Sequence, residues 1–170
     1  MLNISITYVS LDDIIPYVNN PRIHDDKHIK QIVDSISTFS FTNPILLDEH
    51  NEILADHGRY LAAKHLKMET VPCVQILHLT PAQKKAYRIA DNKLTLNGSW
   101  DENLLGLEFK DLSELELDFS LDITGFSLPE IDLTIQSLSE KKEDPLDALP
   151  VPLFPPMFPI ILPAVPALRC

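Results

Sequence analysis

The chain has 170 residues, with 25 acidic against 14 basic side chains and a net charge of −11. This length suits one core domain with accessory segments, and the acidic balance disfavours non-specific binding of a polyanion by the whole surface, so a nucleic-acid contact needs a local basic patch. Two cysteines, Cys73 and Cys170, make neither a disulfide framework nor a zinc site, and residues 1–20 lack the apolar run of a signal peptide. We therefore expect a cytoplasmic protein.

Short strands and amphipathic helices are predicted to alternate along residues 1–98. Alternating β-branched and apolar residues indicate strands, at residues 4–9, 45–48, 52–55 and 70–77. Apolar residues at helical spacing indicate helices, at residues 26–38, 57–66 and 81–96. Thr80 followed by Pro81 is a strong start signal for the third of these helices. The pattern predicts a small α/β domain of the α+β type, with a short mixed sheet flanked by helices.

Two more helices and a proline-rich tail are predicted after this core. Leucines at helical spacing predict a helix over 99–115, and the capping-box spacing of Ser127 and Glu130 starts another that ends near residue 138. Residues 149–168 contain no charge and seven prolines, which exclude a membrane span and predict a disordered tail. The expected divisions are a core (1–98), a helical extension (99–140), and a charged hinge with the tail (141–170).

The strongest functional signal is the place where a predicted strand runs directly into a helix. The turn between them contains Asp56, His57, Gly58 and Arg59. The first N–H groups of a helix have no partner within it, and the helix dipole favours negative charge there. A glycine and an arginine at this point therefore suit a phosphate, from a nucleotide or from a nucleic-acid backbone.

Several short motifs occur in an order that is typical of one family. They are Asn20-Pro-Arg22, Phe39-Ser-Phe-Thr-Asn-Pro44, Ile53-Leu-Ala-Asp-His-Gly-Arg59, Val71-Pro72 and Ala90-Asp-Asn-Lys93. Together they resemble the ParB/sulfiredoxin-like N-terminal domain, also called the ParB-like nuclease domain. The similar branch is found in prophages and fused to site-specific DNA methyltransferases. The resemblance covers about residues 3–135 and implies a small α/β domain with a nucleotide- or phosphate-binding pocket.

The resemblance also implies roles for individual residues. Arg59 matches the last arginine of the family's phosphate-binding motif, Asn92 matches an asparagine of a second motif, and Arg22 belongs to a loop over the pocket. Gly58 N–H groups and Arg59 are then expected to hold a phosphate, with Arg22 and His57 beside it. The implied ligands are CTP or ATP with Mg²⁺, or DNA. The implied partners are a methyltransferase module in full-length relatives and a second copy of the chain, with no membrane.

The sequence also departs from this family pattern. Asp56 stands where close relatives have glycine, which adds a side chain and a negative charge beside the anion site, so weakened or lost nucleotide binding is expected. His57 occupies the position of the sulfiredoxin cysteine, which argues against that chemistry. Neither a helix-turn-helix domain of the ParB kind nor methyltransferase motifs are recognised after the core, and the segment after Pro150 resembles nothing in the family. These departures favour a remnant or stand-alone relative of the N-terminal domain of a prophage DNA methyltransferase.

Two alternatives to a binding function stay open. A metal-assisted nuclease or NTPase would use Asp56, His57 and Asp91 as catalytic candidates, although none is assigned with certainty and no metal ligand is predicted. For His57 a polar turn role is preferred over that of a general base. The second alternative is a truncated or frameshifted gene product that folds but binds nothing.

Other residues have less specific interpretations. The densest basic cluster consists of Lys84, Lys85 and Arg88. These side chains either contact nucleic-acid phosphates or form an exposed helix face. His24 and His28 have a spacing that suits a metal ion, but a solvated helix start is the preferred interpretation. Phe39 and Phe41 are expected in the hydrophobic core.

Overall fold

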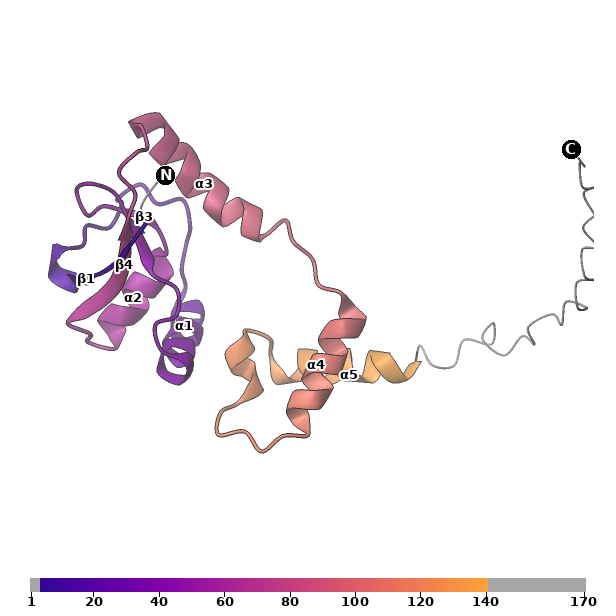
Figure 1. Ribbon diagram of the computed structural model, residues 1–170. Helices are drawn as coiled ribbons and strands as arrows, with labels where there is room; N and C mark the ends of the chain where they lie inside the picture. The colour runs from indigo at the N-terminus through magenta and orange to yellow at the C-terminus, as the bar shows by residue number, and fades with distance from the viewer. Residues whose placement is uncertain (1–3, 141–170) are drawn as a thin grey trace, which may run out of the picture.

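A mixed four-stranded sheet forms the centre of the N-terminal part of the molecule (Figure 1). The computed structural model describes residues 4–140, so the predicted hinge and tail lie outside the described residues. The strands are β1 (Ile6–Ser10), β2 (Ile45–Leu47), β3 (Ile53–Ala55) and β4 (Thr70–Gln75), in the spatial order β1-β4-β2-β3. Strand β4 pairs antiparallel with β1 and parallel with β2, and β2 pairs antiparallel with β3.

Three helices flank this sheet, and each begins as its sequence predicts. They are α1 (Asp26–Phe39), α2 (His57–His65) and α3 (Pro81–Thr95), and a short 3₁₀ turn η1 (Leu11–Asp13) follows β1. The Asp25 carboxylate caps α1 by accepting the His28 N–H at 2.7 Å. Thr80 and Gln83 form a reciprocal capping box at α3. The predicted α/β fold, with a short mixed sheet and flanking helices, is confirmed.

The hydrophobic core lies between the sheet, η1 and α2. It consists of Leu11, Ile14, Ile45, Leu47, Ile53, Tyr60, Ala63, Val71 and Cys73. All three residues of β3 are buried, so this strand is covered on both faces. Burial raises the pKa of the Cys73 thiol to about 11, which keeps it protonated. A strand held so firmly fixes the position of the turn that follows it.

The helical extension is a pair of helices set apart from the sheet, beyond the end of α3 (Figure 1). It contains α4 (Glu102–Ser113), the 3₁₀ turn η2 (Leu121–Thr124) and α5 (Leu128–Glu140). A Cβ at Gly106 would lie 3.0 Å from Leu138 Cγ and 3.0 Å from the Thr134 carbonyl, so only glycine allows α4 and α5 to approach this closely. Phe109 is buried and packs edge-on against Phe126.

The extension meets the core along α1. The Gln31 side-chain amide donates to the Gly125 carbonyl at 3.3 Å, and the Phe39 ring packs edge-on against Phe119. The expectation that Phe39 lies in the core is therefore wrong: its side chain is 47% exposed and contacts the extension. Phe41 packs partly buried against the core. No helix within residues 4–140 has the length and apolar character to cross a membrane.

Candidate functional site

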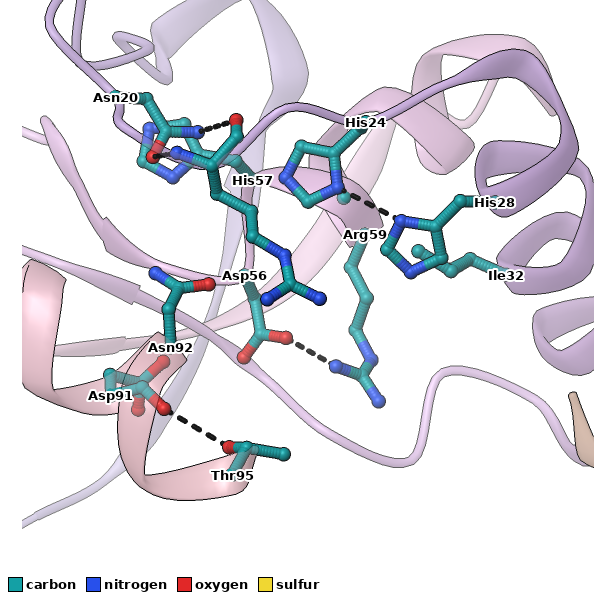
Figure 2. A pocket seen from close by; sticks show the side chains of 12 residues that line it. Asn20, His24, His28, Ile32, Asp56, His57, Arg59, Asp91, Asn92 and Thr95 are labelled. Carbon is teal, nitrogen blue, oxygen red and sulfur yellow. Dashed lines mark hydrogen bonds and ion pairs between the residues drawn. The ribbon is translucent and has the colours of Figure 1, made fainter. Parts of the chain in front are cut away.

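A pocket of about 240 Å³ lies where β3 ends and α2 begins (Figure 2). Its walls come from the loop before α1, from α1, from the first turn of α2 and from the end of α3. The lining residues are Asn20, Arg22, His24, His28, Ile32, Asp56, His57, Gly58, Arg59, Asp91, Asn92 and Thr95. The pocket thus brings together every residue predicted to bind a nucleotide or phosphate and every catalytic candidate. Asn20, Ile32 and Thr95 were not among the predicted site residues, although Asn20 belongs to the motif Asn20-Pro-Arg22.

Asp56 occupies the position between β3 and α2, and its backbone is left-handed (φ 72°, ψ 38°). Glycine adopts this conformation without strain and aspartate does so at modest cost. The Asp56 carboxylate points into the pocket and forms an ion pair with the Arg59 guanidinium (Figure 2). Burial raises the pKa of Asp56 above its ordinary value, although Arg59 acts in the opposite direction.

His57 lies at the first position of α2, against the loop that precedes α1. Its Nε2 accepts the backbone N–H of Tyr17 at 3.3 Å, which leaves the ring proton on Nδ1. Burial lowers the pKa of His57 to about 4, with smaller contributions from His24 and Arg88. The imidazole is therefore uncharged at neutral pH and anchors the loop over the pocket.

Gly58 lies where α2 packs closely against α1. A Cβ at this position would lie 2.7 Å from Ile32 Cδ1 and 3.2 Å from His24 Cε1. Both distances are shorter than ordinary packing allows. A larger residue here would therefore require the Ile32 and His24 side chains to shift.

His24 and His28 form a stacked pair in the pocket wall (Figure 2). Their Nδ1 atoms are 3.2 Å apart. The predicted helix start is present, with Asp25 as its cap, but both histidine rings are only partly exposed to solvent. Burial, His28 and then Arg22 lower the pKa of His24. Within residues 4–140 no group of three or more His, Cys, Asp or Glu side chains is arranged to hold a metal ion.

Lys84 is buried rather than part of an exposed basic face. Its Nζ lies 2.8 Å from Asp48 Oδ2 and 2.6 Å from Glu49 Oε2, both from the turn between β2 and β3. Burial by itself raises the pKa of Asp48, but the Lys84 hydrogen bond and two backbone N–H donors hold that pKa below its ordinary value. The side chain of Lys84 thus anchors α3 to the hairpin.

Arg88 is also buried, one helical turn further along α3. Its Nε donates to the Ile53 carbonyl at 3.0 Å, and its guanidinium pairs with Glu52 and lies 3.7 Å from the centre of the Tyr17 ring. The Arg88 carbonyl accepts from Asn92 Nδ2 at 2.8 Å, which orients the far wall of the pocket. The expectation of an exposed face is wrong for Lys84 and Arg88, because their partners lie on a distant hairpin. Lys85 is exposed, and its contact with nucleic acid stays a prediction.

The fold and the pocket define a small α/β domain with two arginines beside a strand-to-helix turn. Residues 3–92 match the family described as the ParB N-terminal domain. This match covers more than half of the chain, and the chain therefore belongs to the ParB N-terminal domain family.

Individual relatives agree with this assignment. The ParB-like nuclease domain-containing protein YnaK of Escherichia coli (strain K12) is 44% identical over 82 residues, which are 48% of this chain and 94% of YnaK. In structure the chain is similar to the C-terminally truncated chromosome-partitioning protein ParB of Caulobacter crescentus in complex with CTP-γ-S. That similarity has a TM-score of 0.65 over 79% of each chain at 19% identity, and it supports the fold.

The helical extension has a family match of its own. Residues 103–159 match the family described as the ParB-methyltransferase HTH domain. The expectation that no helix-turn-helix domain follows the core is therefore wrong, as is the view that nothing after Pro150 resembles the family. The signal was missed because residues 114–127 separate the two helices and a basic recognition helix is absent from the described part.

Proposed function

We propose that the pocket binds the phosphate groups of a nucleotide, with CTP or ATP as the candidate ligands. The observation that carries this proposal is the convergence of Arg22 and Arg59 on one pocket at the start of α2. Arginine pairs with phosphate through two parallel hydrogen bonds, and the first turn of a helix adds N–H donors and a favourable dipole. The complex of the structurally similar ParB with a CTP analogue supports the class of ligand.

Asp56 sets the strength of this binding. Its carboxylate already neutralises Arg59, so an incoming phosphate has to share or displace it. Mg²⁺ prefers oxygen ligands such as carboxylates and phosphates, so an ion held by the Asp56 carboxylate would reduce the repulsion between that carboxylate and the phosphate. We therefore expect weak binding that Mg²⁺ strengthens.

Isothermal titration calorimetry with CTP, ATP and pyrophosphate, with and without Mg²⁺, tests the proposal. Asp56→Asn keeps the size of the side chain and tolerates the left-handed backbone, so in the absence of Mg²⁺ it should tighten binding by about tenfold. Arg59→Ala should abolish binding, while Glu69→Gln, outside the pocket, should change nothing. Unchanged affinity in Arg59→Ala would contradict the assignment, and so would the absence of binding in both the wild type and Asp56→Asn.

We further propose that the domain serves a methyltransferase-related system, as a relative or remnant of a longer prophage protein that pairs with DNA or with a second copy of itself. The match of residues 103–159 to the ParB-methyltransferase HTH family supports this role. The genomic sequence downstream of the gene tests the origin: methyltransferase motifs in any of the three frames would support it. Their absence in all three would count against a remnant of such a fusion.

A nuclease or NTPase is the second candidate function. It is favoured by the two carboxylates of Asp56 and Asp91 in the same pocket as the arginines. Cleavage of plasmid DNA or hydrolysis of CTP that requires Mg²⁺ and disappears in Asp91→Ala would support this function. Cleavage or hydrolysis that persists in Asp91→Ala would exclude the proposed role of that residue.

A further inference from the structure

The charge of the helical extension differs from that of a nucleic-acid-binding unit. Residues 101–140 carry 11 acidic side chains and one basic side chain, Lys110. A helix that enters a DNA groove is held by lysine and arginine contacts to phosphates. This excess of acid repels a phosphate backbone, although residues 103–159, which also include Lys141 and Lys142, match a family described as a helix-turn-helix.

The inner face of α4 is already used for packing within the extension. Gly106 lies against Leu138, and Phe109 is 3% exposed and packs against Phe126. The hydrophobic contacts that stabilise the helix pair are therefore provided by this face.

Two leucines occupy a different, solvent-exposed face of α4. Leu104 is 62% exposed and Leu107 is 48% exposed. Glu108 and Asp111 follow at the spacing that places them on the same helical face, and both are exposed. We call Leu104, Leu107, Glu108 and Asp111 the α4 outer face. It combines an apolar stripe with carboxylates, the pattern of a helix that docks against a partner.

We propose that the α4 outer face docks a basic amphipathic helix of a partner protein. The leucines fit the apolar side of such a helix, since burial of exposed leucine surface is favourable. Glu108 and Asp111 pair with lysine or arginine at its margins, which fixes orientation and speeds association. Charge decides the partner: an acidic surface excludes both a phosphate backbone and a second copy of the same face.

Binding of a labelled synthetic helix of leucine and lysine to the full chain tests this proposal by fluorescence anisotropy. The same peptide with glutamate in place of lysine is the charge control. The lysine peptide should bind, and the double substitution Leu104→Ser/Leu107→Ser should weaken it by about tenfold or more. Glu108→Lys/Asp111→Lys should weaken it comparably. Leu77→Ser replaces a leucine of the N-terminal core domain that is 65% exposed, and it should leave the affinity for the lysine peptide unchanged.

Several outcomes would overturn the proposal. The proposal is wrong if the lysine peptide fails to bind the full chain, or if it binds the leucine double variant as tightly as the wild type. It is also wrong if the lysine peptide binds no better than the glutamate peptide. A duplex or single-stranded DNA that binds the full chain and loses affinity in Lys110→Glu would instead assign the extension to nucleic acid. Circular dichroism of each variant shows whether α4 is retained. None of these measurements depends on the pocket, so they neither support nor contradict the proposal that the pocket binds a nucleotide.

Discussion

The core and the helical extension use charged residues in opposite ways. Residues 1–100 carry 11 acidic and 10 basic side chains, whereas residues 101–140 carry 11 and one. In the core, basic side chains pair with acids across the fold, as Lys84 does with Asp48 and Arg88 with Glu52. In the extension most carboxylates face solvent. The acidity of the whole chain is therefore a property of the extension, and it does not argue against an anion in the core pocket.

The two regions also differ in how they use apolar residues. In the core, strands β2, β3 and β4 are buried between helices, and the pocket lies at the end of β3. The extension buries one face of each helix and leaves leucines of α4 exposed. This difference indicates that the core forms its ligand site internally, while the extension presents a surface. Four measurements test this difference between the core and the extension.

The largest effect is expected for Phe109→Ala in the extension. Phe109 is 3% exposed and contacts Phe126 edge-on, and truncation of a buried phenylalanine costs about 3–5 kcal/mol. Because Phe109 is remote from the sheet, amide hydrogen exchange should show lost protection in α4 and α5 only. Equal loss of protection in β4 would show that the core and the extension unfold as one unit.

The second effect concerns the ion pairs that hold α3 on the hairpin. Arg88→Met removes a buried cation with three partners, and the free energy of unfolding should fall by about 3 kcal/mol. Lys85→Met, at the exposed lysine of the same helix, should change it by less than about 0.5 kcal/mol. Urea unfolding curves of the two variants provide the comparison. Similar losses in the free energy of unfolding for both variants would mean that the buried contacts of Arg88 do not stabilise the fold more than an exposed lysine does.

The third effect is a pH dependence confined to the core. Burial lowers the pKa of His57 to about 4, so the unfolded chain binds a proton near its ordinary pKa while the folded chain does not. Stability is then lost as the pH falls from about 6.5 towards 4, by about 1–2 kcal/mol after solvent screening. His57→Gln should remove this loss in unfolding curves measured across that range, whereas the exposed His78→Gln should retain it.

The smallest effect is expected on the α4 outer face. Leu104→Ser and Leu107→Ser replace side chains that are largely exposed, so the free energy of unfolding should change by less than about 0.5 kcal/mol each. Thermal unfolding of the single variants measures this change. A loss as large as that of Phe109→Ala would mean that these leucines belong to the packing of the extension and are not a docking surface.

Much of the core was predictable because its signals are local. The capping residues Asp25 and Thr80 act within three positions, and the buried run Ile53–Ala55 identifies a strand covered on both faces. The pocket residues Arg22, His57, Arg59 and Asn92 were found through ordered motifs. The family of the extension was missed, because its two leucine-rich helices carry a single basic residue, Lys110, where several are expected of a helix that reads DNA.

Local sequence patterns specify the strands, the helices and the turn of Asp56, His57, Gly58 and Arg59, because periodicity, caps and turn residues act over a few positions. The burial of Lys84 and Arg88 depends instead on the fold, since their carboxylate partners lie about 36 residues away. The fold also places His24 against Gly58 and turns Asp56 towards Arg59. Whether a charged side chain is exposed depends on partners that the fold brings close, and neither spacing nor composition encodes them.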